Sequence, residues 1–144
     1  MALSIEDRLD IQELYARWNH FADTGDFEGN LSLVTDNIHY STHLREIHDI
    51  DQMRAYLSPR ADGLASAPVR DEQHWINNIV LDPGPDADTV LGRAFMVGIG
   101  RDAETNAVRF NHFGHYHDTI VRIDGTWKFA ERLFEEHMRH FPES

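Results

Sequence analysis

Residues 108–138 read VRFNHFGHYHDTIVRIDGTWKFAERLFEEHM, and this stretch decides the fold. Two long segments, Val108–Ile123 and Thr126–Met138, mix β-branched and aromatic residues with polar ones, as is typical of half-buried strands. Only Asp124 and Gly125 separate them, and Asp-Gly is a strong signal for a two-residue hairpin turn. The sequence therefore predicts a long antiparallel hairpin.

Two further strands are predicted before this hairpin. Gln73–Leu81 is rich in Ile and Val and ends at the turn-forming segment Pro83–Asp86, and Thr89–Ile99 follows. Together with the hairpin, they predict a meander of four long antiparallel strands. A short alternating run, Ile38–Thr42, predicts an early strand that can join an edge of the sheet.

The start of the chain has helical spacing instead. Ser4 and Asp7 have the spacing of a capping box, so a helix should begin there. It should end at Gly25, because glycine adopts the left-handed cap conformation at little cost. Apolar and aromatic residues recur at three- and four-residue steps on one face of this helix: Ile11, Leu14, Tyr15, Trp18, Phe21 and Ala22.

Two shorter helices are predicted after the first. Asp26 can cap one that runs through Val34 and ends at the turn Thr35–Asn37. The other covers Asp49–Leu57 and stops before a loop over Pro59–Pro68, because proline disrupts a helix interior.

Helices followed by a meander indicate an α+β fold in one domain over residues 1–144. A long, twisted sheet with Gly92, Gly98 and Gly114 as bend points can wrap its concave face around the first helix. We therefore expect a cone-like, curved antiparallel sheet wrapped around N-terminal helices, with a pocket between helix and sheet.

The charge balance and residue inventory exclude several classes of function. The 25 acidic and 13 basic residues give a formal net charge of −12, which repels nucleic acid and acidic membrane surfaces. The absence of cysteine excludes a disulfide scaffold and a thiol nucleophile, and it fits a reducing cytoplasm. Met1–Asp10 has no apolar segment, so we expect a soluble chain without a signal peptide. No Gly-rich phosphate loop occurs, so no cofactor is expected.

Asp23 and His74 are the first candidates for catalysis. Asp23 lies in the last turn of the predicted first helix, where the helix dipole disfavours a carboxylate. His74 lies at the start of the first long strand. Taken singly, each has an ordinary structural explanation. As a pair, the carboxylate would orient the imidazole and raise its basicity, which makes a general base for neutral pH.

Candidate metal ligands on the predicted hairpin are His112, His115 and His117. Strand alternation places His115 and His117 on one face and His112, with Asp118, on the other. Two histidines can begin a zinc site, but one strand does not supply a full set of ligands. We therefore expect no metal, and the simpler expectation is that His115 and His117 lie on the outer face or at a subunit contact.

An aromatic cavity wall is a second candidate feature. The side chains that can face one cavity are Tyr15, Trp18, Tyr40, Met96 and Tyr116, although each alone fits an ordinary core position. Arg132 lies on the predicted last strand, and a half-buried guanidinium requires an anion. That anion is either a protein carboxylate or charge that develops on a ligand.

Four segments form a pattern that is found together in one known family: Ile11–Arg17, Phe21–Phe27, His74–Asn78 and Ile123–Phe129. They resemble the SnoaL-like family of the nuclear-transport-factor-like superfamily, which includes scytalone dehydratase and hexachlorocyclohexane dehydrochlorinase. The resemblance spans nearly the whole chain. It implies the α+β cone fold.

The resemblance also implies roles for individual residues. Asp23 and His74 match the catalytic dyad of these two lyases. Arg132 matches an arginine of the dehydrochlorinase, and Tyr40 matches a pocket tyrosine of scytalone dehydratase. His112 is expected to reach the same cavity, where it would contact the substrate together with Tyr15, Trp18, Met96 and Tyr116.

We therefore expect a cofactor-independent lyase or isomerase that acts on a small, hydrophobic, cyclic or aromatic substrate and forms a homodimer or homotrimer. Two alternatives stay open at this point. One is a noncatalytic small subunit that resembles those of ring-hydroxylating dioxygenases. The other is a module that binds a small ligand or a metal.

Overall fold

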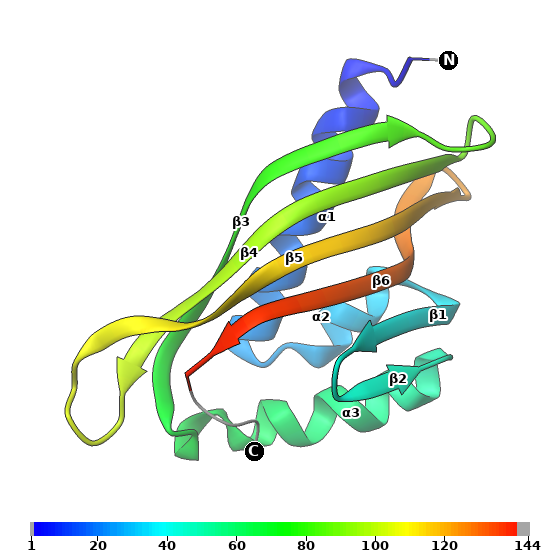
Figure 1. Ribbon diagram of the computed structural model, residues 1–144. Coiled ribbons are helices and arrows are strands. Elements are labelled where there is room, and N and C mark those ends of the chain that lie inside the picture. The colour runs from blue at the N-terminus through cyan, green and yellow to red at the C-terminus, as the bar shows by residue number, and fades with distance from the viewer. Residues whose placement is uncertain (1, 141–144) are drawn as a thin grey trace.

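The computed structural model describes residues 2–140 (Figure 1). Helices come first and a long meander follows, as the sequence predicted. The helical elements are α1 (Ile5–Thr24), α2 (Phe27–Ser32), α3 (Ile50–Gly63) and the 3-10 turn η1 (Leu64–Ser66). The strands are β1 (Val34–Thr42), β2 (Arg45–Ile47), β3 (Val69–Pro83), β4 (Thr89–Asp102), β5 (Val108–Ile123) and β6 (Thr126–Arg139).

Local signals placed the first helix and the last hairpin correctly. The Ser4 hydroxyl accepts the Asp7 amide at 3.0 Å at the start of α1. Gly25 ends the helix with φ +76°, a conformation that favours glycine. Asp124 and Gly125 join β5 to β6 with φ values of +50° and +80°, as a two-residue hairpin turn requires.

The six strands form one open sheet with the order β2-β1-β6-β5-β4-β3. The four long strands are antiparallel neighbours, but β1 runs parallel to β6. The sheet is therefore mixed, whereas the sequence predicted an antiparallel one. Alternation shows which residues share a face of a strand, but it does not show the direction of the neighbouring strand.

Several boundaries differ from the predicted ones, and two of the differences change the type of structure. β1 begins at Val34, so Thr35–Asn37 belongs to a strand and not to a turn, because Val34 is buried and pairs with Phe129 of β6. Helix α3 continues through Pro59 to Gly63 in place of the predicted loop. One proline removes a single helical hydrogen bond, and packing of Tyr56 and Leu57 against the core compensates for it.

The sheet curves over α1, which packs against its concave face (Figure 1). Buried side chains of α1 meet the inner faces of the central strands in one core, which includes Ile11, Leu14, Trp18, Ile120 and Phe129. The convex face carries large exposed apolar side chains: Trp75, Phe95, Phe110 and Phe113.

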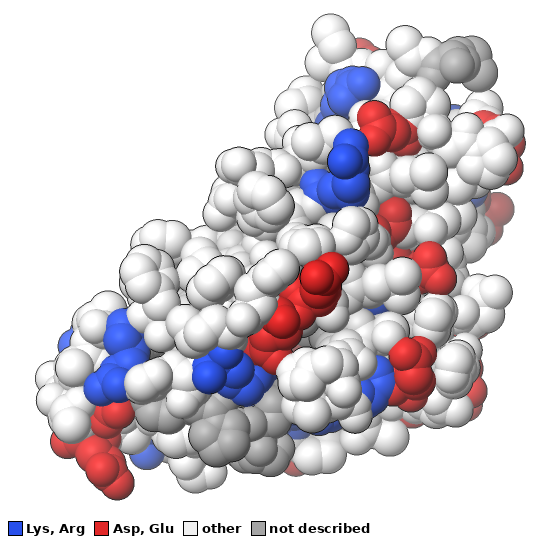
Figure 2. Space-filling view, in the orientation of Figure 1, with Lys and Arg blue, Asp and Glu red and all other residues white. Residues whose placement is uncertain are grey.

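Figure 2 shows the molecule from the convex side, where Lys, Arg, Asp and Glu form small separate groups on a largely uncharged surface. Within residues 2–140, no helix is both long enough and apolar enough to cross a membrane.

Candidate active site

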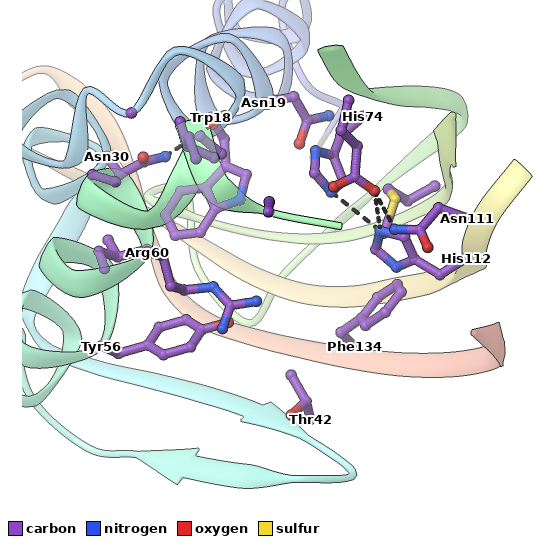
Figure 3. A pocket seen from close by; sticks show the side chains of 18 of the residues that line it. Trp18, Asn19, Asn30, Thr42, Tyr56, Arg60, His74, Asn111, His112 and Phe134 are labelled. Carbon is purple, nitrogen blue, oxygen red and sulfur yellow. Dashed lines mark hydrogen bonds and ion pairs between the residues drawn. The ribbon is translucent and has the colours of Figure 1, made fainter. Parts of the chain in front are cut away.

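A cavity of about 480 Å³ lies between the helices and the concave face of the sheet, where the sequence predicted a pocket. Tyr56 and Arg60 of α3 lie on one side of it, and His74, Asn111 and His112 lie on the other (Figure 3). The cavity therefore combines an aromatic and basic wall with a wall of imidazole, amide and carboxylate groups.

Asp23 holds His74 through two contacts. The His74 amide donates to Asp23 Oδ2 at 2.9 Å, and ring Nδ1 lies 2.5 Å from Oδ1. β3 is an edge strand, so amides on its outer side need a partner from elsewhere, and the end of α1 supplies one. An ionised carboxylate only accepts hydrogen bonds, so Nδ1 carries a proton and Nε2 is the basic atom.

The surroundings make His74 a stronger base than an ordinary histidine. Burial lowers its pKa, whereas the hydrogen bond to Asp23 and the negative charge of Glu72 raise it. The net effect raises the pKa of His74 above its usual value. The side chain remains 23% exposed, so Nε2 is sheltered and still accessible from the cavity.

His112 reaches the same place from β5. Its Nε2 lies 3.2 Å from Nε2 of His74, and the two rings meet edge to face. In the sheet register both residues are opposite Gly98 of β4. A Cβ atom at Gly98 would lie 2.4 Å from Cδ2 of His112, so the glycine leaves the space in which the rings meet.

Sequence reasoning missed two polar residues beside the histidines. Glu72 Oε1 lies 3.4 Å from His112 Nε2 and accepts a hydrogen bond from Asn111 Nδ2 at 2.5 Å. Residues two positions apart in a strand share a face, so Glu72 would have been placed beside His74 on the inner face. The predicted strand began at Gln73 and therefore left Glu72 out. Asn111 had no such signal, because a register shift in the pairing of β4 with β5 buries it beside His112.

Glu72 is a carboxylate at neutral pH. Burial raises its pKa, but the hydrogen bond from His112 and the charge of His74 outweigh burial and lower the pKa to about 2. The histidine pair therefore lies next to a fixed negative charge.

Most of the predicted site residues line the cavity: Trp18, Tyr40, His74, Met96, His112 and Tyr116. Asp23 lies behind His74 and contacts it without forming part of the wall. Tyr15 and Arg132 do not line the cavity, which corrects the expectation that they contact a substrate.

Arg132 instead forms a buried ion pair beneath the cavity. Its Nε lies 2.9 Å and its Nη2 3.2 Å from the two carboxylate oxygens of Asp118. The Tyr15 hydroxyl donates to the same carboxylate at 2.6 Å. The guanidinium carbon lies 3.8 Å from the ring centre of Tyr116 and 3.9 Å from that of Phe129. The anion that Arg132 requires is therefore a protein carboxylate, and the pair supports the cavity floor.

His115 and His117 lie on the outer face of β5, as alternation predicted. Their ring centres are 4.7 Å apart. His115 also contacts His137 at 2.9 Å and Glu135 at 3.2 Å. His115, His117 and Glu135 form a group of possible metal ligands on the convex face.

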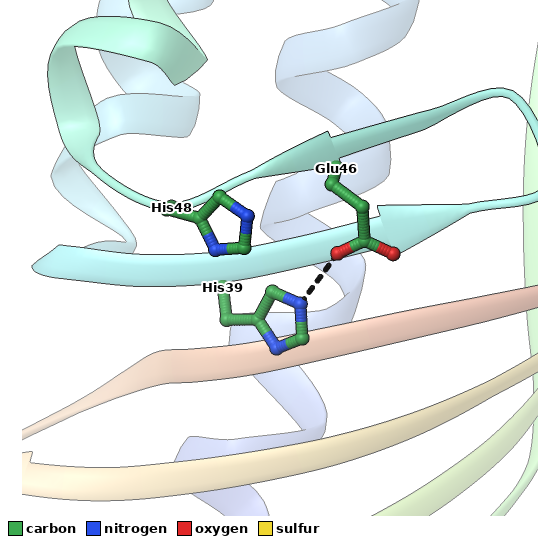
Figure 4. Close-up of side chains that lie close together, drawn as sticks. All are labelled: His39, Glu46 and His48. Carbon is green, nitrogen blue, oxygen red and sulfur yellow. Dashed lines mark hydrogen bonds and ion pairs between the residues drawn. The ribbon is translucent and has the colours of Figure 1, made fainter.

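A second group of possible ligands lies on β1 and β2 (Figure 4). Nε2 of His39 lies 2.7 Å from Glu46, and Nδ1 lies 2.9 Å from Glu131. The hydrogen bonds to Glu131 and Glu46 raise the pKa of His39 above its usual value. His39 therefore contacts a carboxylate through each ring nitrogen. His48 stacks on it with ring centres 5.2 Å apart.

Solved structures share this architecture. A candidate scytalone dehydratase from Novosphingobium aromaticivorans is similar with a TM-score of 0.81 and 19% identity, and the match covers 97% of this chain and 90% of that one. A protein of unknown function from Mycobacterium tuberculosis matches with a TM-score of 0.78 and 25% identity, over 95% and 80% of the two chains. A type 2 hexachlorocyclohexane dehydrochlorinase matches with a TM-score of 0.75 and 19% identity, over 93% and 87%.

The sequence itself gives the family. Comparison with curated proteins found no match. The family model of the SnoaL-like domain matches residues 3–133, which is most of the chain. The chain therefore belongs to the SnoaL-like family.

Proposed function

We propose that the protein is a cofactor-independent lyase or isomerase of the dehydratase type, with His74 as its general base. The observation that carries this proposal is the double contact of Asp23 with His74, which fixes the tautomer and leaves Nε2 for the cavity. His74 would remove a proton from a carbon next to an electron-withdrawing group. Asp23 would stabilise the imidazolium that results.

Negative charge that develops on the substrate must be stabilised by hydrogen-bond donors in the cavity. Arg132 does not line the cavity, so other side chains must supply these donors. Burial raises the pKa of Tyr40 well above its usual value, so the phenol keeps its proton and can donate it. Asn19 offers a buried Nδ2 that finds no hydrogen-bond partner within residues 2–140. Both side chains line the cavity, and we assign them to the developing oxyanion.

His112 is suited to the second proton transfer. Its Nε2 lies 3.2 Å from Nε2 of His74, within hydrogen-bond distance. His112 can give its Nε2 proton to a leaving hydroxyl group, so that water departs as a double bond forms, and can then take the proton that His74 has removed. Return of the proton to another carbon would give an isomerase instead.

The shape of the cavity favours a flat, compact substrate. Trp18 and Tyr40 are stacked with ring centres 6.3 Å apart, and Tyr56 lies 5.9 Å beyond Tyr40. A volume of about 480 Å³ is within the range of small-molecule sites. A cyclic or aromatic molecule would pack on these rings with its acidic C–H bond toward His74.

A substrate panel tests the proposed reaction. Cyclic β-hydroxy ketones and chlorinated cyclohexanes would be incubated with the protein, and formation of a conjugated product or release of chloride would be followed. Turnover that disappears in the His74→Gln variant supports the proposal. Turnover of a panel member that is unchanged in this variant contradicts it.

The Asp23→Asn variant should lower the pKa of His74, because it replaces a charged hydrogen-bond acceptor that raises this pKa. A base works only when neutral, so the rising limb of kcat/KM against pH should move to lower pH while its plateau falls. NMR titration of the His74 ring measures the same shift without a substrate. Asp10→Asn, at an exposed position of the same helix, should leave the midpoint in place. Equal midpoints in wild type and Asp23→Asn would refute the proposed role of Asp23.

The homodimer or homotrimer expected from the sequence stays a prediction, as does a cytoplasmic location. Light scattering on the purified chain measures its mass in solution. A stable assembly of identical chains favours the enzyme. Dependence on a larger partner favours the noncatalytic subunit.

A further inference from the structure

We propose that Glu72, His74 and His112 bind a divalent transition-metal ion of the zinc class at the cavity wall. Their donor atoms all lie within 4.8 Å of one another. Nε2 of His112 is 3.2 Å from Nε2 of His74 and 3.4 Å from Oε1 of Glu72. Bonds of about 2.0–2.1 Å in a tetrahedral site separate ligand atoms by roughly 3.3 Å. Two of the three separations therefore already suit such an ion.

A polar side chain lies behind each ligand, and it forms a hydrogen bond with His74 and with Glu72 but not, within residues 2–140, with Nδ1 of His112. Asp23 contacts Nδ1 of the first imidazole at 2.5 Å. Glu136 Oε1 lies 3.3 Å from Nδ1 of His112, and Asn111 donates to Glu72 at 2.5 Å. A carboxylate behind a ligating imidazole is the usual arrangement in zinc sites, because it fixes the ring and strengthens the donor atom. The three ligands and the polar side chains behind them therefore all come from this chain.

The three side chains leave one coordination position of a tetrahedral ion unfilled, as a metal site that is open to small molecules requires. All three side chains line the cavity, so a fourth position is open to water or to a small molecule. One strand alone does not supply a full set of metal ligands. The set found here combines two residues of β3 with one of β5, which face each other across Gly98.

The other two groups of possible ligands fit less well. Both ring nitrogens of His39 are already within 2.9 Å of carboxylates, and the other two members of that group, Glu46 and His48, are exposed. His115 and its neighbours lie on the outer face, where His117 and Glu135 are exposed. Binding of the ion at Glu72, His74 and His112 does not depend on the proposed reaction. One consequence does rest on that function: the ion would occupy the lone pair of His74 Nε2 and so compete with proton abstraction.

The direct test titrates the chelator-treated protein with Co²⁺ and Zn²⁺. The wild type should bind one ion per chain at this site, seen as visible absorption of four- or five-coordinate Co²⁺ and as heat of Zn²⁺ binding. Glu72→Gln and His112→Gln should each weaken binding by more than about tenfold. His48→Gln and His115→Gln are matched controls from the other two groups and should bind as the wild type does. Binding that persists in Glu72→Gln and His112→Gln, or is lost only in a control, overturns the proposal.

Gly98→Ala tests the geometry without removing a ligand. The added Cβ would lie 2.4–2.5 Å from two ring atoms of His112 and 2.9 Å from Oε1 of Glu72, so these ligand groups must shift from their present positions. Affinity for Zn²⁺ should fall by at least about tenfold, since ligand positions matter within about 0.5 Å. Gly63→Ala, where a Cβ meets nothing within 4 Å, is the control. Circular dichroism checks that both variants fold. Unchanged affinity in folded Gly98→Ala contradicts the assigned site.

Assays of turnover separate this inference from the proposed function. Inhibition by Zn²⁺ that is relieved by a chelator supports both. Turnover that requires Zn²⁺ supports the metal site and contradicts a metal-free base at His74. No binding of either ion, with turnover intact, overturns the metal site alone.

Discussion

The His74→Gln variant is expected to lose about 10²–10⁴-fold in kcat on any substrate that the wild type converts. Glutamine keeps most of the bulk of the side chain and an N–H that can bond Asp23, but it has no basic nitrogen. The loss should therefore appear in kcat, with little change in thermal stability. Steady-state kinetics and thermal unfolding of the same preparation measure the two effects.

His115→Gln is the matched control for this prediction. It makes the same chemical change on the outer face of β5, away from the cavity. Its kcat should equal that of the wild type. If both variants keep full activity, His74 is not the base and the reaction proceeds elsewhere.

Asp118→Ala should lower the free energy of unfolding by about 3–5 kcal/mol, because it leaves a buried guanidinium without its counter-ion. The side chains of Arg132 and Asp118 are 1% and 0% exposed. Burial lowers the pKa of Arg132, but the charge and hydrogen bond of Asp118 together with Tyr116 and Tyr15 outweigh burial and raise it, so Arg132 stays charged. The Tyr15 hydroxyl would also lose its acceptor. Urea denaturation measures the change.

Two further variants show whether the loss of unfolding free energy in Asp118→Ala comes from the unpaired buried charge or from the substitution as such. Asp82→Ala removes an exposed partner of Arg93 and should cost less than about 1 kcal/mol. The double variant Asp118→Leu with Arg132→Met should regain much of the loss, since no unpaired charge remains in the core. Equal costs for Asp118→Ala and Asp82→Ala would show that the buried pair contributes no more than a surface pair.

Much of the fold was predictable because its signals are local. A capping box at Ser4, a left-handed glycine at residue 25 and the Asp124-Gly125 turn each act within a few residues, and each lies where the sequence predicted it. The errors arose where distant contacts decided the outcome. Helix α3 passes through Pro59 because its neighbours pack on the core.

The candidate site was predictable only in part. The contact between Asp23 and His74 joins residues 51 positions apart, and no local pattern reports it. The pair was predicted from the chemistry of a carboxylate beside an imidazole and from the family resemblance. The partner of Arg132 could not be chosen from the sequence. Whether a guanidinium faces a substrate or a protein carboxylate depends on which side chains the folded sheet places within about 3 Å.

The sequence by itself determined the order of helices and strands, the ends of the first helix, the last hairpin and the acidic, cysteine-free character of the chain. Only the tertiary structure brought Glu72 and Asn111 to the histidines and placed Gly98 between the two rings. The two differ in the distance along the chain over which the deciding interactions act. Backbone conformation depends mainly on neighbouring residues, whereas a site is formed by side chains whose separation is fixed by strand register, bulges and packing over the whole sheet.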